Sequence, residues 1–203
     1  MSESRSSSPL PLSLPLPSPL RVGYLPGLTE EEVTWEPVTL GAAAQTVTVQ
    51  MPRLQPAQWD ALAARVRQAA REHLKQLPVS CLIEVIDQAA QRWLDPSYPL
   101  RQLADRTLPI ITGWDPEMIR QGLNATFKTY RATQLHRFVA EDFDNPKMLD
   151  EFQPRPKGGF ARALGPDLLV HVWAGNVPGL PLWSLISGLL VKAGSVGKVA
   201  RAE

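Results

Sequence analysis

The sequence predicts an α/β fold, and three segments carry that prediction. Residues 29–54 hold short runs of alternating Thr and Val, which are typical of a small β-hairpin. Residues 55–140 repeat apolar residues every three or four positions, which is the period of amphipathic helices. Residues 168–200 follow the order strand, tight turn, apolar helix and strand, which is the βαβ unit that begins a doubly wound, cofactor-binding sheet.

Length and composition limit the class of protein. The 203 residues are 44% hydrophobic and 20% charged, which suits one globular domain with arms. A net charge of +1 gives no support for binding to nucleic acid or to an anionic membrane. No apolar run reaches the roughly 18–20 residues of a membrane-spanning helix. The single cysteine, Cys81, excludes an internal disulfide framework and a Cys-cluster metal site, and it fits a reducing, cytoplasmic compartment.

Residues 1–28 are predicted to form a disordered arm. Pro, Ser and Leu alternate over the first twenty residues, and proline at this density interrupts both helices and sheets. A signal peptide is the alternative, because Arg5 precedes leucines, but the prolines break the apolar segment and no clear cleavage site follows. In the hairpin segment 29–54, Pro37 indicates that the first strand lies at an edge.

The region 55–162 is predicted to be helical. A first helix over 55–77 would bury a stripe made of Trp59, Leu62, Val66, Ala69, His73 and Leu77. A second helix begins after Pro78 and ends at Asp95. Asp115-Pro116-Glu117 is typical of a helix N-terminus and opens a third helix, which continues with a break to Phe138. The polar segment 141–167 is predicted to be a connection with a short helix over 148–152.

Residues 163–203 are predicted to begin a Rossmann-like domain. The apolar run 168–174 is typical of a strand that is buried on both faces of a parallel sheet. A sharp turn follows, Pro181 opens an apolar helix, and Gly194 is predicted to end it. Lys192, in the last turn of that helix, is expected to interact with the helix dipole.

Asn176 is the residue to examine for chemistry. It follows the carboxyl end of a predicted parallel strand, where open α/β sheets bind their ligands. Its uncharged amide could stabilise an oxyanion while a carbonyl carbon becomes tetrahedral. The structural alternative is that Asn176 only tolerates an unusual turn conformation beside two glycines, and spacing alone favours this alternative.

Other reactive residue types are predicted to be structural. Cys81 lies on the apolar stripe of a predicted helix, where a cysteine usually behaves as a small buried hydrophobe. His73 and His171 are expected in the core or at its boundary, and His136 at the surface. The Asp and Glu residues show no paired spacing that would predict a metal site.

Residues 163–203 resemble the acyl-CoA reductase family typified by LuxC, which reduces acyl thioesters in bacterial bioluminescence and related fatty-aldehyde pathways. The resemblance is carried by AGNVPGLP and KAGSVGK. That family belongs to the aldehyde dehydrogenase superfamily, so the resemblance implies the N-terminal part of an aldehyde-dehydrogenase-like fold. The superfamily places an Asn from a Pro-Trp-Asn-x-Pro turn in the oxyanion hole. Val-Trp-Ala-Gly-Asn-Val-Pro stands there in this chain, which implies that role for Asn176.

The resemblance also implies a cofactor site at Lys198. The superfamily carries a Lys-Pro-Ser/Ala-Glu motif at the end of the next strand, whose Lys and Glu hold the adenosine ribose or its 2′-phosphate. Lys198 lies 22 positions after Asn176, but Val199 replaces the Pro and Arg201 stands where the Glu would be. A guanidinium favours a phosphate, so this departure favours NADPH. The structural alternative makes Lys198 and Arg201 ordinary solvated residues.

The resemblance implies part of a long-chain acyl-CoA reductase, which captures the acyl group on a cysteine and reduces it with NADPH to a fatty aldehyde. In the superfamily that cysteine lies far beyond the oxyanion Asn, so we expect an N-terminal fragment without the nucleophile and without activity of its own. Its partners would be a fatty acyl-CoA or acyl-protein thioester, an acyl-transferring enzyme and, when complete, identical subunits. The alternative is a non-catalytic helical interaction module with a vestigial reductase segment.

Overall fold

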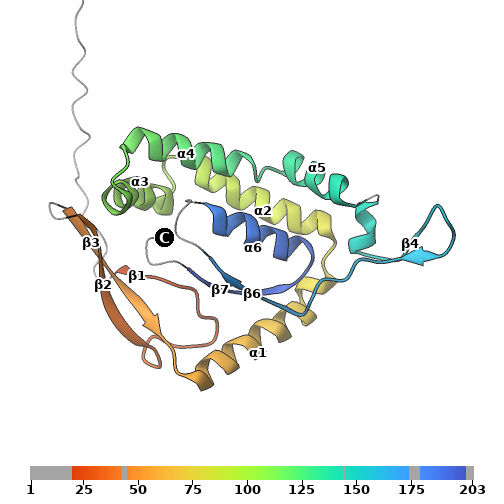
Figure 1. The fold of residues 1–203 in the computed structure, drawn as a ribbon, viewed down its shortest axis with the longest axis horizontal. Helices are drawn as coiled ribbons and strands as arrows, with labels where there is room; N and C mark the ends of the chain where they lie inside the picture. The colour runs from red at the N-terminus through yellow and green to blue at the C-terminus, as the bar shows by residue number, and fades with distance from the viewer. Residues whose placement is uncertain (1–19, 43–44, 144, 174–178, 200–203) are drawn as a thin grey trace, which may run out of the picture.

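A small parallel sheet lies between helices in the computed structural model, which describes residues 20–42, 45–143, 145–173 and 179–199. The sheet pairs β6 (Leu168–Val172) with β7 (Gly194–Lys198). Helix α6 (Leu180–Leu190) covers one face and α1 (Pro56–Glu72) lies against the other, so these elements form three layers (Figure 1). The predicted α/β class and the predicted βαβ unit are confirmed.

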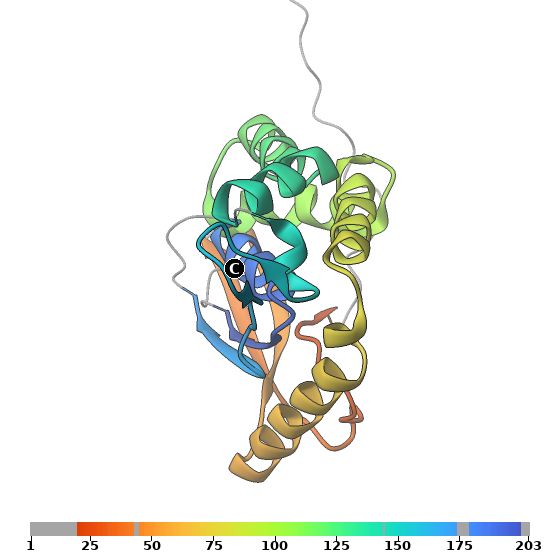
Figure 2. The ribbon, with the colours of Figure 1, turned by 90° about the vertical axis from the view of Figure 1, so that its right-hand side faces the viewer.

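The remaining helices form a layer on the far side of α6. Figure 2 shows this layer at the top and α1 at the bottom, on opposite sides of α6 and its sheet. The layer consists of α2 (Val79–Leu94), α3 (Pro99–Thr112), α4 (Pro116–Lys128) and α5 (Ala132–Asp142), with the 3₁₀ turn η2 (Pro146–Leu149) after it. The largest fully buried side chains of the described residues are Ile83 of α2, Leu135 of α5 and Leu190 of α6.

Two of these helices follow their sequence signals closely, and a third, α3, was not predicted as a separate helix. The Asp115 carboxylate accepts a hydrogen bond from the Glu117 backbone N–H at 2.8 Å, which caps α4 as predicted. Helix α2 also matches its predicted range. Helix α3 lies within the predicted helical region but was not predicted as a separate helix, and it contains Pro109, although proline is normally unfavourable in a helix interior. It ends at Gly113, whose φ of 72° is left-handed.

The predicted hairpin is present at one end of the molecule. Strands β2 (Thr34–Ala42) and β3 (Gln45–Arg53) pair antiparallel, and Pro37 lies on β2, at the edge of the described sheet. Strand β1 (Leu20–Arg21) pairs parallel with the other edge of β3. This strand falls inside the predicted disordered arm, so residues 20–28 differ from the prediction. The contact with β3 is not encoded in the local pattern, and residues 1–19 lie outside the described residues.

Helix α1 ends earlier and buries a different stripe than predicted. It stops at Glu72, and a 3₁₀ turn, η1 (Leu74–Gln76), follows. Leu62 and Ala70 are buried, whereas His73 is exposed, which corrects its predicted place in the core or at its boundary. The close approach of the sheet explains this orientation. A Cβ added to Gly194 would lie only 3.0 Å from Val66 Cγ1, so α1 faces β7 through Val66.

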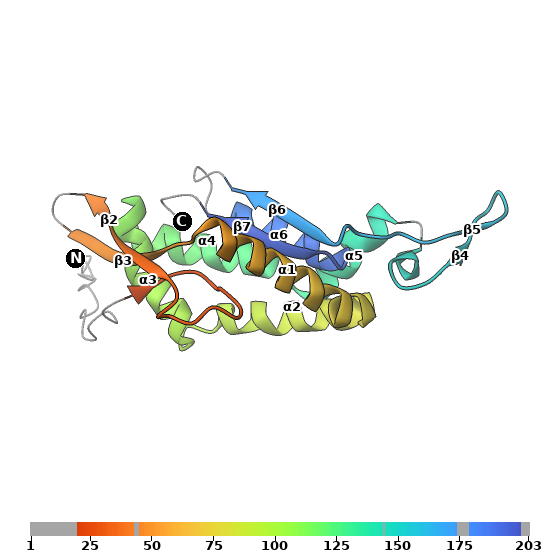
Figure 3. The same cartoon turned by 90° about the horizontal axis from the view of Figure 1, so that it is seen from below.

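A second small hairpin projects from the body and was predicted only as a connection (Figure 3). It pairs β4 (Gln153–Pro154) with β5 (Phe160–Ala161). Gly158 and Gly159, in the turn between them, have φ values of 85° and 77°. Left-handed φ values of this kind favour glycine, which accounts for the glycine pair at the tip.

Lys192 ends α6 and is buried, which corrects two predictions. Its φ is 60°, and the N–H groups of Lys192 and Ala193 bond back to the carbonyls of Leu189 and Gly188, which is a Schellman motif. Lys192 rather than Gly194 is therefore the left-handed C′ residue, and Gly194 begins β7. The Lys192 ammonium donates to Asp150 at 2.5 Å instead of standing at the surface near the helix dipole.

Arg101 is a second buried cation and joins three helices. Its guanidinium donates to Asp105 at 3.0 Å, to the Trp93 carbonyl at 2.8 Å and to the Asn124 side-chain oxygen at 2.8 Å. A further bond reaches the Arg120 carbonyl at 3.3 Å. The side chain is 3% exposed, so every one of these bonds is shielded from water. Arg101 therefore holds α2, α3 and α4 together.

Replacing Arg101 with Met should lower the free energy of unfolding by about 3–5 kcal/mol, because it leaves the Asp105 carboxylate, the Trp93 carbonyl and the Asn124 side-chain oxygen without this donor. Urea unfolding followed by circular dichroism measures the change. The exposed Arg92→Met on α2 is the matched control and should change stability by less than about 0.5 kcal/mol. Equal effects of the two substitutions would contradict the role assigned to Arg101.

Candidate functional site

The candidate site lies at the carboxyl edge of the parallel sheet. Both strands end there, with Val172 opposite Lys198, and the Trp173 N–H donates to the Lys198 carbonyl at 3.1 Å. Lys198 is the last residue of β7 and its side chain is exposed. The structure therefore places Lys198 at the edge where α/β sheets bind ligands. The other two predicted site residues, Asn176 and Arg201, lie outside the described residues.

The prediction that β6 is buried on both faces is wrong for the described residues. Val170 is 72% exposed and Val172 is 76% exposed. His171 is buried on the opposite face, against α6. The reason is geometric: α1 lies mainly beneath β7, so the corresponding face of β6 is left uncovered.

His171 is the centre of a buried polar layer beneath the edge. Its Nδ1 lies 2.7 Å from the Ser184 hydroxyl of α6, and its Nε2 lies 3.2 Å from the Ser195 hydroxyl of β7. The side chain is 8% exposed, which confirms the predicted core histidine, although it has two partners. A hydroxyl can donate or accept, so both ring nitrogens are satisfied in either tautomer. His171 thus links β6, α6 and β7.

Trp173 lies next to His171 and was missed by the sequence analysis. The two rings stack with centroids 5.2 Å apart and an interplanar angle of 18°. The six-membered part of the indole covers Gly197, since a Cβ added there would lie 2.0 Å from the ring. A glycine inside a strand often marks such a close approach, so Gly197 was the available signal. The indole Nε1 is buried and has no hydrogen-bond partner in the part of the chain that the structure describes.

The start of α6 is held against the helical layer. Gly179 precedes α6 with a φ of 84°, and a Cβ added to it would lie 3.1 Å from the Thr126 methyl of α4. Pro181 lies in the first turn of α6, as predicted. Farther along α6, Trp183 stacks on Tyr130 with centroids 5.8 Å apart. These contacts fix where the chain enters α6 after the segment 174–178.

At the opposite end of the sheet, an ion-pair cluster fastens α1 to β6. Asp167, which precedes β6, accepts hydrogen bonds from Arg71 and, at 2.5 Å, from Lys75. The bond from the Arg71 guanidinium, followed by that from the Lys75 ammonium, lowers the pKa of the Asp167 carboxyl to about 2. The cluster therefore supports the sheet and is remote from its carboxyl edge.

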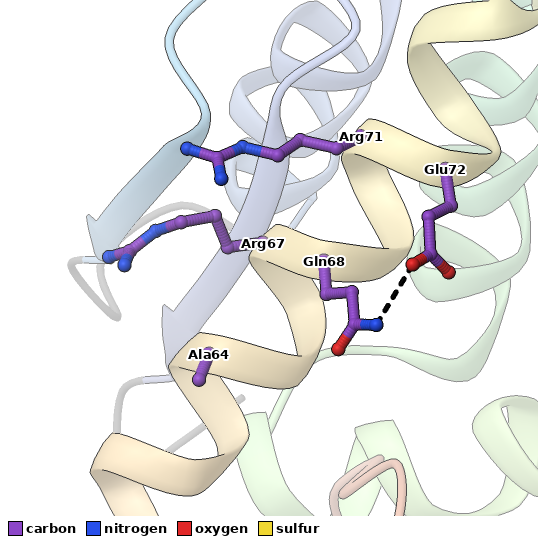
Figure 4. A pocket seen from close by; sticks show the side chains of 5 residues that line it. All are labelled: Ala64, Arg67, Gln68, Arg71 and Glu72. Atoms are coloured by element: carbon purple, nitrogen blue, oxygen red, sulfur yellow. Dashed lines mark hydrogen bonds between the residues drawn. The ribbon is translucent and has the colours of Figure 1, made fainter.

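The open hollow on α1 is not the site. Figure 4 shows Arg67 and Arg71 extending from α1 in one direction, while Gln68 and Glu72 form their own hydrogen bond of 2.8 Å. All the lining side chains come from this single helix, so no second element converges on the hollow. Arg71 is already bound to Asp167.

Cys81 and His136 lie away from the carboxyl edge. Cys81 is partly buried on α2, two residues after Val79, whose N–H bonds the same Asp150 that pairs with Lys192. Lys192 lies two residues before the start of β7, so Cys81 lies near the amino end of that strand. His136 is exposed on α5, as predicted.

Within the described residues, both metal-ligand clusters and membrane-spanning helices are absent. Among residues 20–42, 45–143, 145–173 and 179–199, no group of three His, Cys, Asp or Glu side chains is arranged to hold a metal ion. Within the same ranges, no helix has the length and apolar character needed to cross a membrane.

Comparison with known proteins extends the similarity beyond the site. Residues 74–203 match the model of the acyl-CoA reductase (LuxC) family. The chain belongs to this family. The match confirms the predicted resemblance and includes helices α2 to α5, where the sequence analysis found no motif. The long-chain acyl-protein thioester reductase of Vibrio harveyi is 22% identical over 133 residues, which are 65% of this chain and 28% of that protein. The chain thus spans little more than a quarter of this relative.

The Asp167 cluster predicts a specific acid sensitivity. The folded pKa of about 2 lies below the usual 3.8, so unfolding takes up a proton and stability falls as the pH drops from about 4 to 2. Asp167→Asn should flatten the pH dependence of the unfolding free energy in this range, measured by urea unfolding at several pH values. Asp60→Asn, at an exposed position near the start of α1, is the control and should keep the original slope.

Proposed function

We propose that this chain is the N-terminal part of an NADPH-dependent long-chain acyl thioester reductase that forms a fatty aldehyde. The observation that supports this best is the family match over residues 74–203, which contains the whole βαβ unit and its carboxyl edge. The Vibrio harveyi relative is named for an acyl-protein thioester, so the substrate we propose is a fatty acyl-CoA or an acyl-protein thioester. For the whole protein we propose an aldehyde-dehydrogenase-like fold, a cytoplasmic location, identical subunits and an acyl-transferring partner enzyme.

The proposed reaction begins when a cysteine thiolate adds to the thioester carbonyl. The carbon becomes tetrahedral, its oxygen gains negative charge, and the original thiolate leaves as the acyl-cysteine forms. Asn176 would donate its amide N–H to that oxygen, which lowers the energy of the charged state. Reduced cofactor, when bound, supplies the hydride that the acyl carbon needs to become an aldehyde, and the cysteine thiolate is then released.

We assign the nucleophile to a cysteine outside these 203 residues. Cys81 lies near the amino end of β7, and the five residues of that strand span roughly 13 Å before the carboxyl edge is reached. A thiol at that position does not reach a carbonyl held at the carboxyl edge. Cys81 instead contributes to the packing of α2, where it is partly buried.

The described residues fit a dinucleotide at the carboxyl edge. Lys198 presents an exposed ammonium there, and the Trp173 indole provides a buried donor without a partner in the described residues. An adenosine ribose phosphate is rich in acceptor oxygens and would satisfy donors of both kinds. We propose that Lys198 and Arg201 hold this part of the cofactor, and that the guanidinium favours NADPH over NADH.

Asn176→Ala in the complete enzyme should lower turnover by about 10²–10³-fold with little change in acyl binding, as expected for the loss of one oxyanion donor. Steady-state assays of NADPH oxidation with a long-chain acyl-CoA measure the change.

Asn176→Gly separates the oxyanion role from a turn role. Glycine adopts left-handed turn conformations freely but carries no amide side chain. The oxyanion role predicts that the Gly variant is as slow as the Ala variant. Near-normal turnover of the Gly variant would assign Asn176 to the turn.

Arg201→Glu should weaken NADPH binding more than NADH binding, because a charge-assisted bond to the 2′-phosphate is lost and a repulsion is gained. Fluorescence titrations with the two cofactors measure the ratio of their dissociation constants. Lys198→Gln provides the comparison and should weaken both cofactors if its contact is with the ribose. Equal effects of Arg201→Glu on NADPH and NADH would show that Arg201 does not contact the phosphate.

A further inference from the structure

We propose that Trp173 is a cofactor-binding residue whose indole N–H donates a hydrogen bond to an oxygen on the adenosine ribose of a nicotinamide dinucleotide. The inference rests on the proposed reductase function and adds a residue to which the sequence analysis assigned no role. It is carried by three observations: the unpartnered donor, its place at the carboxyl edge, and the packing that fixes its direction.

The unpartnered donor is the first observation. The Trp173 Nε1 is shielded from solvent, and no acceptor bonds it in the part of the chain that is described. A buried donor left in this state costs about 1–3 kcal/mol, and buried polar groups in folded proteins rarely lack a partner. By contrast, the Trp35 Nε1 donates to the Glu30 carbonyl at 3.1 Å. An acceptor brought by a ligand would remove the cost at Trp173.

The place of Trp173 is the second observation. It directly follows β6, and its backbone N–H bonds the carbonyl of Lys198 at 3.1 Å. Side chains alternate along a strand, so Lys198 and Val172 share one face of the sheet. Trp173 lies on the other face with Gly197 and His171. The carboxyl edge therefore carries an exposed ammonium on one face and a buried indole N–H on the other.

The third observation is that the ring is held in one orientation. Its contact with Gly197 depends on the absence of a side chain there, since a Cβ would lie 2.0 Å from the ring. His171 stacks on its neighbouring surface and is itself fixed by Ser184 and Ser195. A donor whose direction is fixed before binding loses little conformational entropy when an acceptor arrives.

The chemistry at the edge selects the class of ligand. Two donors of different kinds, one charged and one neutral, require a group with several acceptor oxygens. A ribose with its phosphates provides them, and it is the adenosine half of the dinucleotide that the proposed function requires. Trp173 therefore contacts the cofactor directly, whereas His171 is a positioning residue that acts through the indole.

The test is nuclear magnetic resonance of the complete protein labelled with ¹⁵N at the tryptophan indole nitrogens, titrated with NADPH. This chain contributes six tryptophans, and Trp173→Phe assigns the resonance of interest. We expect the Trp173 indole proton to move downfield on binding, because it gains an acceptor. The Trp35 resonance is the internal control and should stay in place, since its donor is already bonded.

Binding constants provide an independent readout. Trp173→Phe removes the N–H together with the outer part of the indole that contacts Gly197, so it should weaken NADPH binding at least about tenfold, and the indole resonance reports the N–H contact by itself. Trp114→Phe, at a 47% exposed position before α4, is the matched control and should bind normally. A loss shared by NADPH and NADH identifies a ribose hydroxyl as the acceptor, and a loss confined to NADPH identifies the 2′-phosphate.

Two outcomes would overturn the inference, and they are distinguishable. If NADPH binds in a Lys198-dependent manner while the Trp173 resonance is unmoved and Trp173→Phe binds normally, the inference is wrong and the proposed function stands. The indole acceptor would then belong to the chain itself. If NADPH does not bind at all, the cofactor assignment in the proposed function fails and the inference fails with it.

Discussion

Parallel strands cannot be joined by a tight turn, so the chain between β6 and β7 must cross over one face of the sheet, and α6 is that crossover. The other face of β7 needs its own cover, which α1 provides from more than a hundred positions earlier in the sequence. Asp167 fixes this cover in place through Arg71 and Lys75. The rest of the fold follows from these requirements, because the helices α2, α4 and α5 in turn bury the outer side of α6.

The same parallel pairing creates the candidate site. Because both strands end at one edge, the end of β6 and Lys198 come together there, and the polar layer of His171, Ser184 and Ser195 supports the edge from beneath. The two faces of the edge differ in chemistry, with an ammonium on one and an aromatic donor on the other. The two donors at this edge suit a ligand with several acceptor oxygens. This agrees with the proposed reductase function, in which the sheet binds the cofactor.

Two buried cations in this protein have structural roles, although the sequence around one of them suggests a ligand-binding role. Lys192 is the clearest case, because a lysine in the KAGSVGK motif invites a ligand-binding role, yet it is buried and paired with Asp150. The Arg101 guanidinium likewise donates hydrogen bonds to groups on α2, α3 and α4. Lys198, in contrast, is exposed at the carboxyl edge. Burial and pairing therefore separate the structural lysine of the motif from the one proposed to bind cofactor.

The sequence by itself determined the elements whose signals are local: the β2–β3 hairpin, helix α2, the Asp115 cap of α4 and the βαβ unit. It also supplied the family resemblance, and Asn176 and Arg201 still rest on it alone. Only the tertiary structure decided the features that depend on distant residues. These are the pairing of β1, helix α3 around Pro109, the exposure of β6, the burial of Lys192 and the unpartnered indole of Trp173. Periodicity and capping are set by neighbouring residues, whereas burial and partnership are set by contacts between segments far apart in the chain, which no local pattern records.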